Sequence, residues 1–196
     1  MPEAHAVLAA MSDAEAARAL ARCCGARRWV EGMQARAPFA TTAALLTAAD
    51  TVWESLDVAD HLEAFAHHPR IGAELPVGEP GPAPLAAGGA PSADPSAGQP
   101  GSSAPDLRET ATWARAEQAG AVHADAETRQ RLRAGNQAYA QAFGFTFIVC
   151  ATGRSAREML DLLEARLHNS PEVERRIAAR EQAKITRLRL EKLATP

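Results

Sequence analysis

The residues that could carry chemistry begin with His67 and His68, a pair that is followed directly by Pro69. Proline cannot continue a helix, and it biases the preceding residue toward an extended backbone. The pair therefore marks the end of a helix at a fixed break. An imidazole gains or loses a proton near neutral pH. A histidine whose orientation is fixed at such a break could therefore act on a ligand. Most histidines at helix ends nevertheless do no chemistry.

A second candidate is the pair Glu117 and Gln118, near the end of a predicted helix. A carboxylate next to a carboxamide offers hydrogen-bond acceptors and donors to a polar heterocycle. Such a pair more commonly lies at a helix end exposed to solvent, and the spacing alone does not distinguish a binding site from an exposed helix end.

A third candidate is the apolar run 145–150, the only strand-like stretch of the sequence. It is short enough to be a buried extended segment without a sheet, and its N–H and C=O groups must then find partners elsewhere. A ligand rich in amide-like groups is one such partner. Residues 152–155 follow and lead into a helix N-terminus, which suits a carboxylate. An ordinary core segment followed by a helix cap fits the pattern equally well.

Thiol and metal chemistry are the weaker alternatives. Cys150 could act as a nucleophile, but its apolar neighbours offer no basic group to lower its pKa, which favours a small core residue. His61 or His123 could join the histidine pair around a metal, yet no two histidines lie four apart, as helical metal motifs require. The sequence also contains no phosphate-binding glycine loop and no nucleophile elbow.

Composition restricts the class of protein. The 196 residues are enough for one domain, and 46% are hydrophobic but only 5% aromatic, which favours packed helices over sheets. A net charge of −3 gives no basic field for nucleic acid or for a membrane surface. Three cysteines, two of them adjacent, form no disulfide framework and indicate a reducing compartment. We expect a cytoplasmic protein without a signal peptide or a membrane span.

Capping signals and apolar periodicity predict a compact all-α bundle of roughly eight helices. These helices are expected to begin after Ser12, near residue 28, after Thr41 or Thr42, and after residues 57, 106, 125, 155 and 170. Most of them are expected to turn an apolar face toward the core. Two of these faces are Val58, Leu62, Phe65 and Ala66 on the fourth helix, and Val173, Ile177, Ile185 and Leu188 on the last.

Residues 76–105 interrupt this pattern, because they hold eight of the 13 prolines and six of the 13 glycines. Such a stretch cannot bury enough apolar surface to offset its ordering entropy, so it is expected to be a flexible insertion. Neither flank looks complete alone. We therefore expect a single domain over residues 1–196.

Four blocks of the sequence together resemble the family of OHCU decarboxylases, where OHCU is 2-oxo-4-hydroxy-4-carboxy-5-ureidoimidazoline. The blocks occur in the family's order, and they are residues 68–72, Trp113 with 117–120, 145–155 and 181–190. The resemblance implies an all-α homodimer that converts OHCU to (S)-allantoin and carbon dioxide, the last step from urate to allantoin. It also implies that neither a metal nor an organic cofactor takes part.

The resemblance assigns roles by position. His68 matches the family's catalytic histidine, and Pro69 matches its substrate-contacting neighbour. Glu117 and Gln118 match the pair that binds the ureido and ring groups of the substrate. From the chemistry, we expect His68 to take or polarise the proton of the substrate hydroxyl, and Glu117 to orient the ureido side.

The two remaining blocks would complete the site. Arg189, rather than Arg187, matches a family arginine near the substrate. The segment whose backbone would meet the substrate consists of Phe147, Ile148, Val149, Cys150 and Ala151.

Three departures from the family pattern leave alternatives open. His67 stands where the family often has alanine, Ala114 stands where many members have a serine that contacts the substrate, and the 76–105 insertion separates two site-bearing blocks. A non-catalytic helical module that binds a ureide or a related heterocycle is the runner-up, favoured by Ala114. A thiol-dependent hydrolase that uses Cys150 is a distant third.

Overall fold

The computed structural model describes residues 3–71, 113, 117 and 124–194, and these form eight α-helices and no strand. The all-α prediction is therefore confirmed for this part of the chain. The helices are α1 (Ala4–Ala9), α2 (Asp13–Cys23), α3 (Arg27–Gln34), α4 (Thr42–Glu54), α5 (Val58–Ala66), α8 (Ala126–Phe143), α9 (Ala156–Arg166) and α10 (Pro171–Lys192).

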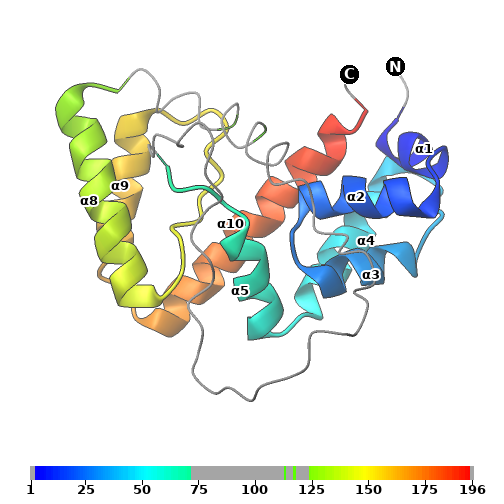
Figure 1. The fold of residues 1–196 in the computed structure, drawn as a ribbon, viewed down its shortest axis with the longest axis horizontal. Helices are drawn as coiled ribbons and strands as arrows, with labels where there is room; N and C mark the ends of the chain where they lie inside the picture. Colours follow the sequence, from blue (N-terminus) through cyan, green and yellow to red (C-terminus); the bar gives the residue numbers. More distant parts are fainter. Residues whose placement is uncertain (1–2, 72–112, 114–116, 118–123, 195–196) are drawn as a thin grey trace, which may run out of the picture.

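The long helix α10 organises the arrangement of the others. Helices α1–α4 gather at one end of the molecule, α8 and α9 form a pair at the other, and α10 crosses between the two groups (Figure 1). α5 lies against the middle of α10, and α10 also contacts α1, α2, α4 and α8. A residue on the inner face of α10 can therefore reach elements that are far apart in the sequence.

Several predicted helix starts are confirmed by capping hydrogen bonds, whereas α1 was not predicted and the start expected after residue 106 lies outside the described residues. The side chains of Ser12, Asp57 and Ser155 each close a capping box at the starts of α2, α5 and α9. Helix α8 ends at Gly144, whose φ of 77° lies in the left-handed region that glycine adopts without strain.

Two expected features fall outside or partly outside the described residues. The insertion at 76–105 lies wholly outside them. Of the helix expected over residues 107–119, the structure describes Trp113 and Glu117, and both are helical.

The predicted inner face of α5 is wrong for three of its four residues. Val58 and Leu62 are 47% and 38% exposed, and Ala66 is also exposed, whereas Phe65 is buried as expected. The helix instead turns Asp60 inward, where its carboxylate accepts a hydrogen bond of 2.9 Å from Arg28. An ion pair with α3 thus sets the rotation of α5, a contact that apolar periodicity does not report.

The predicted inner face of α10 is also partly wrong. Val173 is 38% exposed, although Ile185 is buried as expected. The buried face of this helix is instead rich in polar side chains, namely Glu174, Glu181, Gln182, Thr186 and Arg189. Because buried polar groups require hydrogen-bond partners, this face predicts a network of contacts along the centre of the molecule.

One buried network joins α8, α9 and α10. Arg166 Nε donates to Glu174 Oε1 over 2.7 Å, and the Tyr139 hydroxyl donates to the same carboxylate. Asn169 Nδ2 donates to Glu174 Oε2 over 2.7 Å. The Glu174 side chain has no exposure to solvent. Arg166 Nη1 also donates to the Ile148 carbonyl over 2.8 Å, so the network fixes the extended segment that follows α8.

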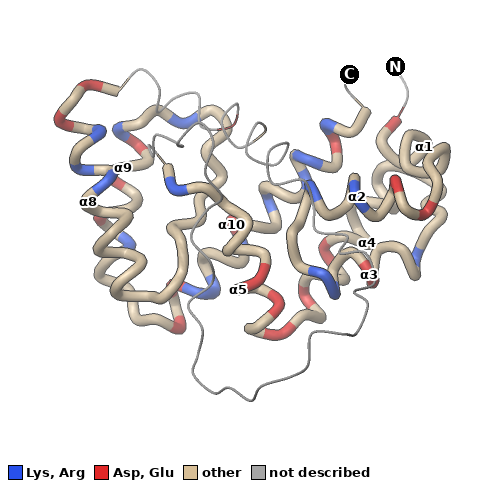
Figure 2. Tube along the Cα trace, viewed as in Figure 1, with Lys and Arg blue, Asp and Glu red and all other residues tan. Residues whose placement is uncertain are grey.

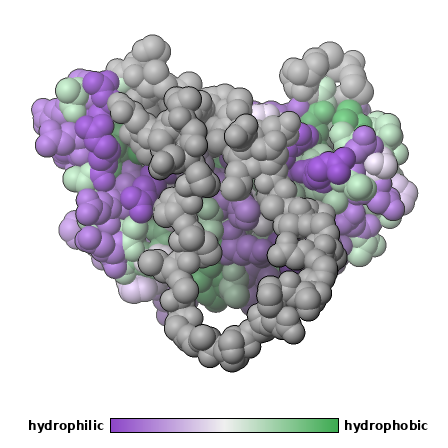
Figure 3. Space-filling model, viewed as in Figure 1, coloured by the Kyte–Doolittle hydropathy of each residue, from purple (hydrophilic) through white to green (hydrophobic). Residues whose placement is uncertain are grey.

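The charges on the outside follow no such pattern. Figure 2 shows acidic and basic residues interspersed along α8, α9 and α10. Figure 3 shows mainly hydrophilic residues on the visible face over α8. Among the described residues, no helix has both the length and the apolar character needed to cross a membrane.

Replacing Arg166 with methionine tests the buried network. The variant leaves the Glu174 carboxylate buried without its cation, so we expect the free energy of unfolding to fall by roughly 3–5 kcal/mol. Urea unfolding followed by far-UV circular dichroism measures the change. Arg157→Met is the matched control on the same helix, because it removes only an exposed pair with Asp161 and should cost less than about 1 kcal/mol. Equal losses in the two variants would contradict the role of the network.

Candidate active site

His68 lies just beyond the end of α5, at the break before Pro69. Its backbone N–H donates to the Phe65 carbonyl over 3.1 Å, and the residue as a whole is partly exposed. Desolvation by the surrounding protein, and then the Arg189 guanidinium, lower the pKa of His68 to about 3, while an interaction with the Gln182 side chain opposes the shift. The ring is therefore neutral at pH 7, with one nitrogen able to accept a proton.

His67 has a different environment. A Cβ atom added to Gly25 would lie 2.3 Å from His67 Cδ2 and 2.9 Å from His67 Cβ, so the ring packs directly on the backbone between α2 and α3. Desolvation lowers the pKa of His67, and Glu63 opposes the change. This contact gives His67 a packing role, and it explains why a glycine stands at position 25.

Arg189 and Glu117 form a buried ion pair. The guanidinium donates from Nε to Glu117 Oε1 over 3.0 Å and from Nη2 to Glu117 Oε2 over 2.9 Å, a bidentate geometry. Lys192 Nζ lies 3.3 Å from Glu117 Oε1, and Arg189 Nη1 donates to the Arg22 carbonyl over 3.3 Å. Since Arg189 directs its donors to protein acceptors, this geometry supports a role in holding Glu117. Direct contact of Arg189 with a substrate stays a prediction.

Arg187 lies on another side of α10. Its Nη1 donates to Asp50 Oδ2 on α4 over 2.5 Å, and both side chains are about 40% exposed. The structure thus directs Arg189, and not Arg187, toward Glu117.

The segment 146–151 is extended and pairs with no strand in the described chain, as predicted. Three side chains satisfy part of its backbone. Arg166 donates a hydrogen bond to the Ile148 carbonyl. Glu181 Oε2 accepts from the Cys150 N–H over 2.9 Å, and Arg154 Nε donates to the Cys150 carbonyl over 3.1 Å.

The unused backbone groups of this segment are the ones that could meet a ligand. No described residue accepts a hydrogen bond from the N–H groups of Val149 and Ala151. The side chains of Phe147, Ile148, Val149 and Ala151 are buried in the core, so they are held by packing. A ligand at this segment would therefore contact mainly its main-chain groups.

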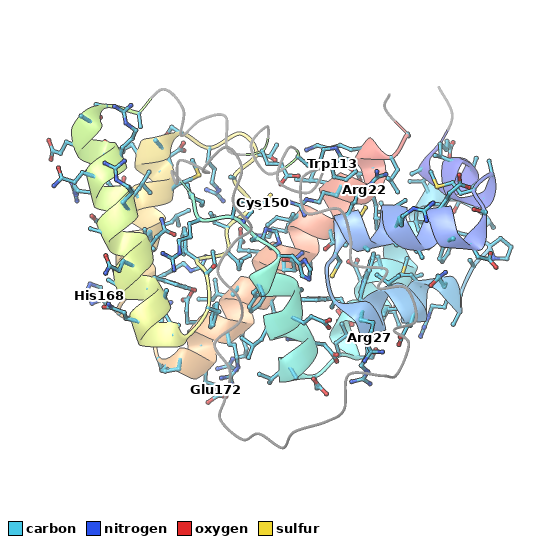
Figure 4. All side chains as sticks on the ribbon, in the orientation of Figure 1. Arg22, Arg27, Trp113, Cys150, His168 and Glu172 are labelled. Carbon is cyan, nitrogen blue, oxygen red and sulfur yellow. The ribbon has the colours of Figure 1, made fainter. Side chains whose placement is uncertain are left out.

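Electrostatic interactions connect the sequence blocks that resemble the family. Desolvation raises the pKa of the Cys150 thiol, and the charges of Glu181 and Glu117 add to this effect. Arg189 acts on His68 in turn. In Figure 4, Cys150 lies beside the middle of α10, and Trp113 lies next to Arg22, whose guanidinium carbon is 5.5 Å from the Trp113 ring centroid. Three sequence blocks thus converge on α10.

Some predicted site residues cannot be placed in this way. Pro69 follows His68 and is partly exposed, whereas Gln118 and Ala114 lie outside the described residues. Glu181 and Gln182 belong to the last block of the family pattern, but reasoning from the sequence gave them no role. The signal that could have found them is the helical spacing of polar residues from Glu174 to Arg189, which puts them on one face.

The thiols are poor nucleophiles in this environment. Burial raises the pKa of Cys23 and of Cys24 to about 12, and the pKa of Cys150 is also raised. The thiolate is the reactive form of cysteine, so these shifts weigh against a hydrolase that uses Cys150. Among the described residues, no three His, Cys, Asp or Glu side chains gather as metal ligands would.

Comparison with known proteins identifies the family. The family model described as OHCU decarboxylase matches residues 9–87 and 92–191. The chain belongs to the OHCU decarboxylase family. It is 36% identical over 175 residues to the uric acid degradation bifunctional protein TTL of Arabidopsis thaliana. The aligned residues cover 87% of this chain and 45% of that relative.

Another relative is the 2-oxo-4-hydroxy-4-carboxy-5-ureidoimidazoline decarboxylase of Amia calva. The two are 40% identical over 74 residues, which cover 38% of this chain and 42% of that protein. The chain therefore spans less than half the length of the curated relatives that it matches.

One solved structure agrees with the family assignment, and a second agrees with the fold. A crystal structure of OHCU decarboxylase in the presence of (S)-allantoin aligns with a TM-score of 0.65 and 32% identity, over 90% of this chain and 96% of that one. A structure of (S)-allantoin synthase aligns with a TM-score of 0.63 over 98% of this chain and 54% of that one, but at 17% identity it supports the fold alone.

Replacing Arg189 with methionine tests the buried pair of this OHCU decarboxylase family member. Among the described residues, the variant leaves the largely buried Glu117 carboxylate with Lys192 as its one remaining partner. We therefore expect the free energy of unfolding, measured in urea, to fall by roughly 3 kcal/mol. Arg187→Met, on the same helix, removes a half-exposed pair and should cost less than about 1 kcal/mol. If Arg187→Met proved the more destabilising variant, the two arginines would have been assigned to the wrong sides of α10.

The lowered pKa of His68 predicts a pH dependence of stability. In the unfolded chain this group takes up its proton near the ordinary value of 6.5, but in the folded chain it does so only near pH 3. The unfolded state thus binds more protons as the pH falls below 6.5, and the free energy of unfolding decreases.

We therefore expect His68→Asn to lose part of the slope of stability against pH between pH 6.5 and 5. Urea unfolding at a series of pH values measures this slope. His67→Asn should retain the contribution of His68 and lose only its own. An unchanged slope in His68→Asn would show that His68 is not shielded from water in the folded state.

Proposed function

We propose that this protein decarboxylates OHCU to (S)-allantoin, the last step from urate to allantoin, without a metal or an organic cofactor. The observation that carries the proposal is that burial and the charge of Arg189 keep His68 neutral, while the same arginine holds Glu117 in a buried ion pair. Family membership supports it, as does the relative whose crystal structure was determined in the presence of (S)-allantoin.

The chemistry of the substrate makes a cofactor unnecessary. When the bond to the carboxylate breaks, its electron pair forms a double bond to the adjacent ring carbon, and carbon dioxide leaves. The π pair of the C=N bond moves onto the ring nitrogen, which takes up a proton. The hydroxyl then loses its proton and becomes the carbonyl of the product, while the carbon that bears the ureido group takes up a proton. Because only one face of that carbon may be protonated to give the (S) product, the protein must hold the substrate in one orientation.

His68 is suited to act on the substrate hydroxyl. A neutral imidazole offers a lone pair that accepts the hydroxyl proton or polarises the O–H bond. An imidazolium could do neither, and it would also stabilise the ground-state carboxylate that has to leave. The neutral state of His68 therefore fits the reaction better than a charged one.

Glu117 and the extended segment are suited to orient the substrate. The Glu117 carboxylate is fixed by Arg189 and Lys192, and it remains an acceptor for N–H groups of the ureido side. Backbone N–H groups of the Phe147–Ala151 segment would donate to carbonyl or carboxylate oxygens of the substrate. In this proposal Pro69 and Gln118 contact the substrate, and no metal is needed to hold it.

A non-catalytic module that binds a ureide remains the runner-up, because Ala114 replaces a serine found in many members of the family. The two functions differ in one measurable respect. The module would bind allantoin without accelerating the loss of carbon dioxide.

The location and the assembly of the protein also belong to the proposal. We infer a cytoplasmic location, supported by the three free thiols Cys23, Cys24 and Cys150. We also infer a homodimer, on the resemblance to the family. Light scattering after size-exclusion chromatography tests the dimer, and a monomeric mass at micromolar concentration would exclude a stable one.

The decisive test follows circular dichroism of allantoin while urate oxidase and the intervening hydrolase generate OHCU in the cuvette. We expect the wild-type protein to accelerate the appearance of a strong optical signal, and His68→Asn to reduce kcat by roughly 100-fold or more, since a positioned base contributes at least that much. His67→Asn is the matched control and should retain most of the turnover.

Two outcomes would contradict the proposal. Slow formation of optically inactive allantoin at the rate without protein would exclude the enzyme and leave the binding module. Loss of turnover in His67→Asn but not in His68→Asn would transfer the catalytic role to the neighbouring histidine.

A further inference from the structure

We infer that Gln182 is a positioning residue for His68: its amide oxygen accepts the ring N–H of the neutral imidazole, which leaves the other ring nitrogen free to act on the substrate. The inference rests on the proposed function and adds a residue to it. It concerns the side of His68 that faces α10, whereas the proposed function concerns the side that faces the substrate.

The position of Gln182 is defined by burial and by one hydrogen bond. The residue has 0% exposure on the inner face of α10. Its Nε2 donates to Thr186 Oγ1 over 3.2 Å, which turns the amide so that Oε1 points away from that hydroxyl. Among the described residues, Oε1 has no hydrogen-bond partner. A buried acceptor of this kind is unfavourable unless a donor comes close to it.

The ring of His68 is the donor that lies nearby. It interacts with the Gln182 side chain, and this interaction favours the protonated ring. The amide N–H group of Gln182 already donates to Thr186, so the amide oxygen is the atom left to accept from the ring. Two other groups near the ring are occupied elsewhere. Arg189 donates to Glu117 and to the Arg22 carbonyl, and His67 packs on Gly25. Hydrogen bonds in a site without ligand are often poorly aligned and tighten when the substrate binds.

An acceptor at one side of a neutral imidazole determines its tautomer. The N–H is drawn to the nitrogen next to the amide oxygen, and the lone pair appears on the opposite nitrogen. Without that acceptor both tautomers would be populated, and a fraction of the molecules would present an N–H where the substrate hydroxyl needs an acceptor. Gln182 would thus keep all molecules in the productive form.

The charged groups around His68 do not replace this contact. Arg189 on α10 faces the ring as a cation, but its charge is balanced by Glu117. His67 precedes it in the chain and is the other titratable group that acts on it. Neither can accept the ring N–H in the way a neutral amide oxygen can: Arg189 has no lone pair, and His67 is held against Gly25.

Gln182→Met is the first test, because methionine has a similar volume and no acceptor oxygen. The tautomer of His68 is read from long-range proton–nitrogen correlations of its ring in the ¹⁵N-labelled full-length protein. We expect one tautomer in the wild type and a mixture in Gln182→Met. Gln137→Met is the matched control, since Gln137 is exposed on α8, and it should leave the His68 signals unchanged.

Turnover gives the second readout. In Gln182→Met we expect kcat for OHCU to fall by roughly tenfold, with KM changed by less than about twofold, because the substrate still binds but fewer rings are in the productive tautomer. Gln182→Glu keeps the acceptor and adds a charge. A carboxylate beside the ring raises the pKa of His68, so the acid limb of kcat/KM should move to higher pH by about one unit or more.

The outcomes separate this inference from the proposed function. If the ring nitrogens of His68 keep one tautomer in Gln182→Met, or if Gln182→Glu leaves the acid limb unmoved, the role of Gln182 is excluded. If the wild-type protein does not decarboxylate OHCU, the proposed function fails, and the nitrogen signals of Gln182→Met still decide whether the amide sets the tautomer.

Discussion

The structure depends on the polar face of α10, which runs through the centre of the molecule with its charges turned inward. A buried carboxylate or guanidinium is tolerated only when a partner satisfies it, so each polar residue on this face dictates what must lie opposite. Glu174 requires Arg166 and Tyr139, and Arg189 requires Glu117. The chain thus has to bring α8, α9 and residue 117 onto α10, because any other packing would leave a buried charge without a partner.

The same constraint builds the site. Arg166 crosses from α9 to reach Glu174, and its remaining donor holds the Ile148 carbonyl, while Glu181 holds the N–H of Cys150. The extended segment is therefore fixed by side chains instead of by a neighbouring strand. A strand would have used its N–H and C=O groups on both sides, whereas this arrangement leaves some of them for a ligand. Stability and the proposed capacity to bind a polar heterocycle would thus come from one set of contacts.

How much could be predicted from the sequence depended on whether the signal was local. Helix starts at Ser12, Asp57 and Ser155 were predictable because a cap involves residues three positions apart. The rotation of α5 was not, because it depends on the Arg28–Asp60 pair between residues 32 positions apart. The polar face of α10 was missed for a related reason. Apolar periodicity treats Glu174 and Arg189 as surface residues, and only their distant partners make their burial possible. The roles of His68, Glu117 and Arg189 came from the family resemblance, and the spacing alone left them open.

The pKa of His68 bears on how the proposed reaction could proceed in steps. With a pKa of about 3 in the free protein, the ring is too weak a base to remove a hydroxyl proton outright. The proposed substrate, however, brings a carboxylate close to the ring, and a nearby negative charge raises the pKa of a histidine. Binding would thus make His68 a better acceptor at the moment when the hydroxyl is in place. Carbon dioxide leaves as a neutral molecule, so the negative charge passes to the ring of the intermediate and disappears only when the intermediate takes up a proton. The pKa of His68 then falls again, and the imidazole tends to release its proton. A histidine held neutral by burial and by Arg189 is in this way controlled by the charge that the substrate brings and that protonation of the intermediate neutralises.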